Sequence, residues 1–326
     1  MRTSIDSPSE TVVAWLLDSD PAIRWQVMRD LLDAPAADVA NERARVSSEG
    51  WGARLLDLEG DDGQWEGGAL FPARRPDGPV GLGDGQPWTA TEPTLSLLQL
   101  FGVDPSADRV RRGVERVRDN CRWEHAGQPF FDGEVEPCIN GRTVSLGVYY
   151  GQKVDGIVDR LLGEQLEDGG WNCEAENGSV RSSFDTSINV LEGLLAYERE
   201  NGPSQRLTAA RRRAEEYYLE RALFRRKSTG EVVRPEYLEF SFPNRWHYDV
   251  LRGLEYFRAA GDRPDPRVDE AIGVVRSRRQ PDGTWLLENT HPGAVHFVLE
   301  DGDGRPSRWN TLRALRVLRW YESAAA

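Results

Sequence analysis

One short motif returns along the chain and constrains the fold more than any other feature. It reads Gln165-Leu-Glu-Asp-Gly-Gly-Trp171 and Gln280-Pro-Asp-Gly-Thr-Trp285, and Asp62-Gly-Gln-Trp65 repeats it without the leading glutamine. Each copy closes an apolar stretch of helical periodicity, and another helix-like stretch follows about fifteen to twenty-five residues later. A motif that returns at long intervals is typical of a repeat architecture.

Five apolar runs that resemble one another recur along the chain together with this motif. They span residues 88–101, 138–150, 184–197, 246–257 and 309–320. When Leu95, Val144, Leu191, Leu251 and Leu312 are aligned, the spacings are 49, 47, 60 and 61 residues. More charged helices are predicted between them, at residues 106–119, 153–166, 205–222 and 266–279. Each repeat is therefore an inner helix, a link, an outer helix and a loop, which predicts an all-α fold.

Helices paired in this way form either an open solenoid or a closed ring. The glycine-tryptophan loops favour the ring, an α/α toroid of five to six helical hairpins with inner and outer helix rings. We expect a single domain over residues 1–326, with N-terminal outer helices in 1–60 and the hairpin repeats in 61–326. In such a toroid the inner helices start at one mouth of a central cavity, so we expect functional residues at those starts.

The N-terminal part carries its own helix signals. Residues 10–33 predict two helical stretches, the second starting with Asp20 as N-cap and Pro21 at the first helical position. Ala36 to Leu58 predicts one further helix. The glycine- and proline-rich stretch from Gly67 to Pro87 predicts a loop.

The net charge and the hydropathy of the chain limit which partners and which cellular compartment are expected. The net charge of −13 opposes the binding of polyanions, so nucleic acid is not expected as a partner. No window approaches the eighteen or so apolar residues of a membrane span, and the N-terminus lacks an apolar signal-peptide core. We expect a cytoplasmic protein; peripheral membrane contact and the oligomeric state stay open. The three cysteines are odd in number and widely spaced, which argues against a disulfide framework.

The repeated motif resembles the QW motif of the squalene–hopene cyclase and protein prenyltransferase superfamily, a glutamine followed by Gly-x-Trp. The resemblance covers roughly residues 50–321. It implies a terpenoid-cyclase-like protein that binds a linear, apolar isoprenoid in the central cavity, with acid-initiated class II cyclisation as its activity. Two alternatives stay open, a non-catalytic isoprenoid- or lipid-binding toroid and a carbohydrate-active toroid, so whether the chain is an enzyme is undecided.

The candidate for the acid that would begin cyclisation lies in a stretch that resembles the Asp-x-Asp-Asp-Thr-Ala motif of class II terpene cyclases. At the positions of that acidic head this chain has Ser182, Ser183, Phe184 and Asp185, so only the last aspartate is kept. Protonating an alkene needs an acidic carboxyl group in a dry site, which makes Asp185 the candidate. The alternative is that Asp185 only caps its helix.

Other candidates stand at the starts of the remaining inner helices. The predicted catalytic residues are Asp185, Asp249 and His247. The predicted substrate-binding residues are Trp88, Glu92, Cys138, Asn140, Tyr149, Phe184, Trp246 and Trp309. Aromatic faces stabilise carbocations, although ordinary core packing explains the same aromatic residues equally well. The other histidines, His125, His291 and His296, lie in predicted loops and are expected at the surface.

No metal and no cofactor is predicted. The resemblance to the prenyltransferases implies zinc ligands at Asp185, Ser187 and Trp246, and the last two are not the cysteine and histidine required. A rearranged set of Cys138, Cys173 and His247 is the alternative, against which each cysteine is read as a small buried apolar residue.

Overall fold

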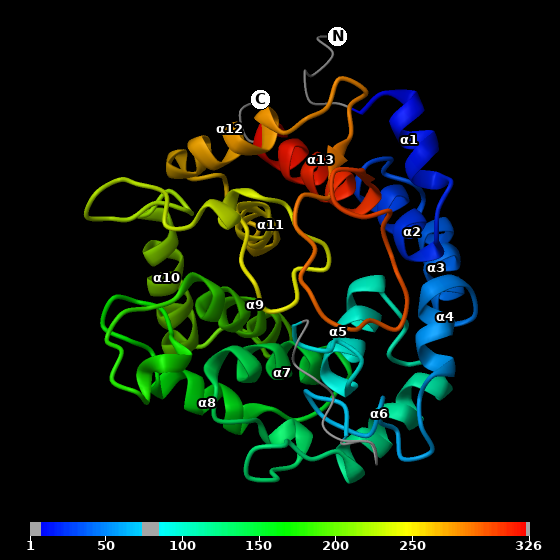
Figure 1. Ribbon diagram of the computed structural model, residues 1–326, viewed down its shortest axis with the longest axis vertical. Helices are drawn as coiled ribbons and strands as arrows, with labels where there is room; N and C mark the ends of the chain where they lie inside the picture. The colour runs from blue at the N-terminus through cyan, green and yellow to red at the C-terminus, as the bar shows by residue number, and fades with distance from the viewer. Residues whose placement is uncertain (1–7, 74–84, 324–326) are drawn as a thin grey trace. The chain divides into compact units, whose positions relative to one another are not determined.

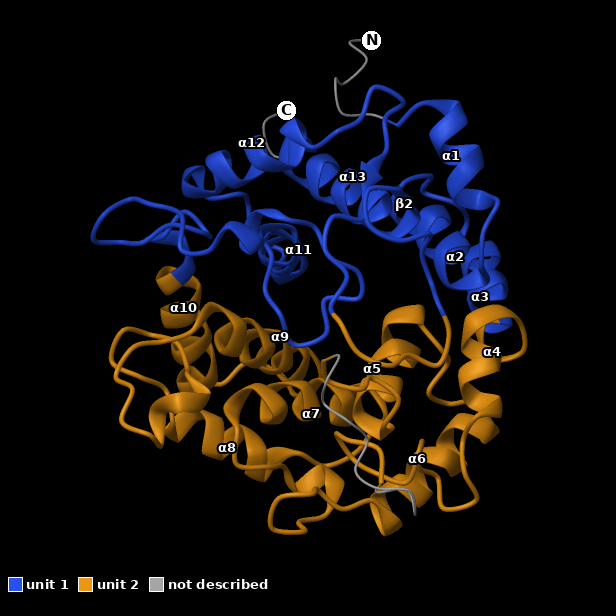
Figure 2. Cartoon of the chain, viewed as in Figure 1, with its two compact units in different colours: residues 1–45, 218–291, 298–326 blue, residues 46–217, 292–297 orange. Residues whose placement is uncertain are grey.

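The computed structural model describes residues 8–73 and 85–323, which divide into two compact units (Figure 2). Unit 1 comprises residues 1–45, 218–291 and 298–326, and unit 2 comprises residues 46–217 and 292–297. The predictions for the extreme N-terminus and for most of the glycine-rich loop fall on residues 1–7 and 74–84, outside the described residues. A single domain over the whole chain stays a prediction.

The predicted all-α class is confirmed in both units (Figure 1). Unit 2 holds α4 (Gly50–Asp57), α5 (Thr91–Phe101), α6 (Asp108–Asn120), α7 (Pro137–Tyr149), α8 (Asp155–Gly163), α9 (Phe184–Asn201) and most of α10 (Gln205–Leu219). Unit 1 holds α1 (Glu10–Leu17), α2 (Pro21–Asp30), α3 (Ala36–Ala44), α11 (Val250–Ala260), α12 (Asp269–Ser277) and α13 (Arg308–Ser323). Short 3-10 turns are η1 (Arg45–Ser47), η3 (Phe130–Asp132), η4 (Cys173–Ala175), η5 (Pro235–Leu238) and η6 (Pro266–Val268). In the described part of the chain the sheet is one antiparallel pair, β1 (Trp285–Leu286) with β2 (Pro306–Ser307).

Two N-terminal predictions have opposite outcomes. The start of α2 is confirmed, because the Asp20 side chain accepts a hydrogen bond from the Ala22 N–H at 2.9 Å. The single helix over residues 36–58 is wrong, because α3 ends at Ala44, η1 follows, and α4 begins anew at Gly50, whose φ is +66°. A left-handed residue ends helical hydrogen bonding, and glycine adopts that conformation without a steric penalty.

The three copies of the repeated motif share one geometry. Each tryptophan Nε1 donates at 2.7 Å to a carbonyl ten residues upstream, that of Leu55, Leu161 or Val275, at the end of the preceding outer helix. Each tryptophan N–H donates to a hydroxyl in the next inner helix, that of Thr91, Ser187 or Thr311. The motif therefore joins the end of one helix to the start of the next, which explains why it punctuates the repeat.

Replacing one of these tryptophans tests that role. Trp171→Phe removes the bond to the Leu161 carbonyl and leaves a cavity, because Trp171 is fully buried. We expect the free energy of unfolding in urea to fall by about 2–4 kcal/mol. Trp320→Phe is the matched control, since the Trp320 indole donates to the Asp262 carbonyl at the surface. Equal losses in the two variants would show that the motif is not a structural joint.

Helices α5, α7 and α9 of unit 2 lie side by side and run in the same direction (Figure 1). Between α5 and α7, Glu92 pairs with Arg142 near the starts and Gln99 donates to Ser145 further along. Between α7 and α9 the backbones touch, because a Cβ on Gly193 would lie 2.2 Å from the Gly141 carbonyl oxygen. The starts of these inner helices therefore lie at one end of unit 2, as the repeat predicts.

Candidate functional site

Four side chains lie close together at the starts of α7 and α9. We call this group the cysteine site, and its members are Glu136, Cys138, Cys173 and Thr186. The two cysteine Sγ atoms lie 3.1 Å apart, and Cys138 Sγ lies 3.5 Å from Glu136 Oε2. Thr186 Oγ1 donates to Cys173 Sγ at 3.5 Å. Both cysteines are half-buried, so the group is reachable from solvent.

The repeated motif explains how Cys173 reaches α9. Trp171 is held against the first turn of α9, because its carbonyl accepts from Ser183 N and its N–H donates to Ser187 Oγ. Cys173 follows two residues later and begins η4, where its N–H donates to Thr186 Oγ1 at 3.4 Å. The loop that follows the second motif thus crosses the start of an inner helix and brings the thiol of Cys173 to that of Cys138.

The two thiols of the cysteine site have unequal acidities. The contact with Cys138 lowers the pKa of Cys173, and the Thr186 hydroxyl lowers it further. The same contact, burial and the negative charge of Glu136 raise the pKa of Cys138. The thiolate form of a cysteine, not the thiol, is the nucleophile and the metal ligand.

Asp185 is the second residue of α9 and does not cap it. The N-cap is Ser183, whose side chain accepts from the Thr186 N–H at 3.3 Å. The alternative that Asp185 is the helix cap is therefore wrong, and its half-buried carboxylate stands in the first turn. Ser182 is also engaged, because its hydroxyl donates to Asp168.

Three predicted substrate-binding residues in unit 2 bind other parts of the chain. Glu92 is 1% exposed and pairs with Arg142 at 2.7 Å. Asn140 accepts from the Glu134 N–H and donates to its carbonyl, which fixes the turn before α7. The Tyr149 hydroxyl donates to the Val103 carbonyl.

The predicted aromatic residues are mostly buried against other rings or carbonyls. Trp88 Nε1 donates to the Pro292 carbonyl at 3.0 Å. Phe184 packs on Tyr217 with ring centroids 5.4 Å apart, and Trp309 stacks on Phe242 at 4.5 Å. These are the contacts expected from core packing, so a ligand-binding role for these rings stays a prediction.

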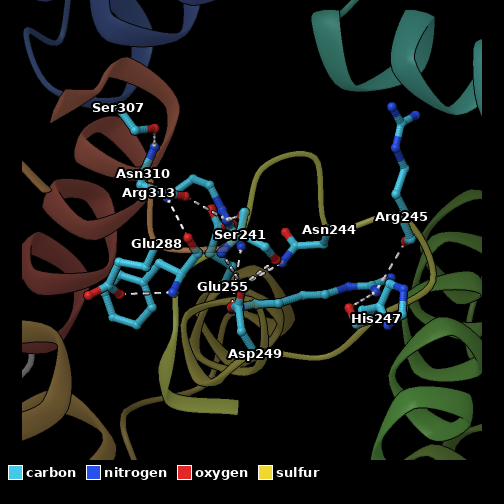
Figure 3. A network of polar contacts seen from close by, with 12 residues as sticks. Ser241, Asn244, Arg245, His247, Asp249, Glu255, Glu288, Ser307, Asn310 and Arg313 are labelled. Carbon is cyan, nitrogen blue, oxygen red and sulfur yellow. Dashed lines mark hydrogen bonds and ion pairs between the residues drawn. The ribbon is translucent and has the colours of Figure 1, made fainter. Parts of the chain in front are cut away.

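In unit 1, the helix predicted over 246–257 begins later than expected. α11 starts at Val250 with Asp249 as its N-cap, so Trp246 and His247 precede the helix. Asp249 is 1% exposed and accepts from Arg252 N, from both the N–H and the hydroxyl of Ser241, and from Asn244 Nδ2 (Figure 3). These bonds give Asp249 a capping role.

His247 lies in a stack of rings in unit 1. Its ring centroid lies 3.6 Å from that of Trp246 and 3.8 Å from that of His291. His291 and His296 lie in loops as predicted but are less exposed than expected, because both are half-buried and His296 Nε2 lies 2.9 Å from Thr94 Oγ1. His125 is exposed, as predicted. Since His247 and His291 are far apart in sequence, no local pattern pairs them.

The stacked His291 predicts a pH-dependent stability. Burial lowers the pKa of His291 from 6.5 to about 4, so the unfolded chain binds the proton more readily than the folded one. The contribution is complete above pH 6.5 and is lost as the pH falls toward 4. We expect a loss of roughly 2 kcal/mol in this window, which is absent in His291→Phe because phenylalanine keeps the stack without titrating. Urea unfolding of both proteins across the window measures the difference, and parallel pH curves would contradict it.

Comparison with known proteins gives structural matches alone. No family model and no curated protein matches the chain. The type II terpene cyclase MstE from Scytonema, in its apo form, matches with a TM-score of 0.45 and 16% identity over 94% of this chain and 87% of that chain. A variant of it in complex with geranylgeranyl dihydroxybenzoate matches with a TM-score of 0.40 and 16% identity, over 94% and 87% of the two chains. A protein from Actinoplanes matches with a TM-score of 0.43 and 16% identity, over 94% and 91%.

Because these identities and TM-scores are low, we base the functional proposal on the residues of this chain. Among residues 8–73 and 85–323, none of the helices combines the length and apolar character that a membrane span requires.

Proposed function

We propose that the chain is a terpenoid-cyclase-like protein that binds a linear isoprenoid at the starts of α7 and α9, with Asp185 as the acid that begins cyclisation. The position of Asp185 carries this proposal. Its carboxylate lies in the first turn of α9 while Ser183 performs the capping. Asp185 also stands where the resembled acidic motif keeps its last aspartate.

The proposed step is a proton transfer to carbon. Protonated Asp185 gives its proton to one carbon of a terminal alkene, whose π electrons form the new C–H bond and leave a carbocation at the other carbon. A second alkene of the same chain attacks this cation, and loss of a proton from the cyclised cation ends the reaction. Aromatic faces stabilise such cations, and this role falls to the predicted substrate-binding aromatic residues.

Product analysis tests the proposal. The purified chain is incubated with farnesyl diphosphate, geranylgeranyl diphosphate and squalene, and the extracts are analysed by gas chromatography and mass spectrometry. We expect a cyclic isomer of one substrate that is absent from the heat-treated control. Absence of a cyclic product from all three substrates would contradict the proposed cyclisation.

A non-catalytic isoprenoid-binding protein is the second candidate, and the acidic head favours it. Ser182 and Ser183 have hydroxyl groups where the resembled motif has acidic residues, so neither supplies a carboxyl group beside Asp185. The Ser182 hydroxyl donates to Asp168, and Ser183 caps α9. An acid strong enough to protonate an alkene needs neighbours that orient it. Saturable binding of an isoprenoid without any product would identify this function.

A further inference from the structure

We propose that Glu136, Cys138 and Cys173 of the cysteine site bind a zinc ion. Their three ligand atoms, one carboxylate oxygen and two sulfurs, all lie within 4.8 Å of one another. Among residues 8–73 and 85–323 this is the group of histidine, cysteine and acidic side chains whose geometry suits a metal. The sequence predicts no metal, and its alternative ligand set contains His247, where the structure has Glu136.

The ligand types favour zinc over the harder cations. Zinc binds cysteine thiolates and carboxylates, whereas Mg²⁺ and Ca²⁺ require oxygen ligands throughout. Three protein ligands leave one position of a tetrahedral ion for water or an incoming ligand. Cys138 and Cys173 are half-buried, so an ion can enter from solvent.

Two of the three distances between ligand atoms are close to those that a zinc ion requires, and the third, between Cys173 Sγ and the Glu136 carboxylate, is within 4.8 Å. Zinc–sulfur bonds of about 2.3 Å and zinc–oxygen bonds of about 2.1 Å place two sulfurs about 3.8 Å apart and a sulfur and an oxygen about 3.5 Å apart. The distance between Cys138 Sγ and Glu136 Oε2 is 3.5 Å, which already agrees. The two sulfurs are 3.1 Å apart and need to separate by roughly 0.7 Å, which small side-chain rotations achieve.

The helix ends around the cysteine site stabilise the negative charge that the site would carry with zinc bound. Binding releases the two thiol protons to solvent, so two thiolates and one carboxylate around Zn²⁺ carry a net charge of −1. Cys138 lies in the first turn of α7, and Thr186, in the first turn of α9, contacts Cys173. The N-terminal ends of helices stabilise negative charge. The Thr186 hydroxyl, 3.5 Å from Cys173 Sγ, supplies the outer hydrogen bond that orients a metal ligand.

Titration with Co²⁺ tests the proposal, because this ion takes the zinc position and gives an intense near-ultraviolet thiolate-to-metal absorption. The full chain is reduced, freed of metal with a chelator and titrated without any isoprenoid, so the outcome is independent of the proposed function. We expect one Co²⁺ per chain, displaced by stoichiometric Zn²⁺. Cys138→Ala and Cys173→Ala should each weaken binding by more than about 100-fold, and Glu136→Gln by about 10–100-fold with the thiolate absorption retained.

The third cysteine gives the matched control. Cys121 is fully buried, burial raises its pKa to about 12, and it is not a member of the cysteine site. Cys121→Ala should therefore bind Co²⁺ like the unmodified chain. The proposal is overturned if the unmodified chain shows no thiolate absorption, or if Cys138→Ala and Cys173→Ala bind Co²⁺ with unchanged affinity. Circular dichroism of each variant establishes that a loss of binding is not a loss of folding.

Discussion

Asp185→Asn is expected to abolish turnover of the isoprenoid substrate, by roughly a hundredfold or more, because it removes the proposed general acid. The amide keeps the size of the side chain, and Ser183 still caps α9. The melting temperature should therefore stay within a few degrees. Product formation and thermal unfolding, measured on the same preparation, check both parts of this prediction.

Ser183→Ala is the companion variant for stability. It removes the hydroxyl that accepts from the Thr186 N–H, so we expect a loss of about 1 kcal/mol in the free energy of unfolding.

Full turnover in Asp185→Asn would remove Asp185 from the mechanism. Unfolding of that variant would instead show that the carboxylate is structural.

Arg313→Met is expected to cost about 3–5 kcal/mol of stability, the largest effect among the structural variants, because it breaks a buried ion pair. Arg313 is 3% exposed, and its Nε donates to Glu255 Oε2 at 2.5 Å (Figure 3). Its Nη1 donates to the Ser241 carbonyl at 2.9 Å and to Asn310 Oδ1 at 3.0 Å. Methionine fills part of the volume, removes the Arg313 donor from the Ser241 carbonyl and Asn310 Oδ1, and leaves Glu255 paired with Arg316.

Arg319→Met on the same helix is the control, because the Arg319 guanidinium is 41% exposed and pairs with Asp33 at the surface. Its loss should stay below about 1 kcal/mol. Urea unfolding of both variants measures the contrast. Similar losses would show that the buried network does not stabilise unit 1.

Acid unfolding should report the same network. Burial raises the pKa of Glu255, but the charges of Arg316, Arg313 and Arg258 outweigh it and hold the pKa at about 2. The stability from this carboxylate is complete above 4.5, the ordinary pKa of glutamate, and is lost as the pH falls through 2. In Arg313→Met the free energy of unfolding should fall less steeply as the pH is lowered from 4.5 to 2.

The helices could be predicted because apolar periodicity and capping residues are local signals. The start of α2 follows from Asp20 and Pro21, and the runs at 138–150 and 184–197 differ from α7 and α9 mainly at their ends. The predicted run at 246–257 starts too early, because the aromatic residues before Asp249 continue the apolar pattern although they lie outside α11. Apolar spacing alone does not show where a cap interrupts it.

The candidate site could be predicted only in part. The sequence places Cys138 and Asp185 at helix starts, and the repeat places those starts together. The pairing of Cys138 with Cys173 depends on how the loop after Trp171 crosses α9, and the stack of His247 on His291 depends on a distant loop. Such contacts between segments remote in sequence have no local pattern from which to infer them.

Photoaffinity labelling with a geranylgeranyl diphosphate analogue carrying a photoreactive group tests the central claim most directly. The analogue is cross-linked to the full chain, and the labelled peptides are identified by mass spectrometry. We predict saturable labelling of one site per chain, prevented by unmodified geranylgeranyl diphosphate, on peptides that contain the starts of α7 and α9. Labelling that does not saturate, or that falls only on other segments of the chain, would contradict isoprenoid binding at this site.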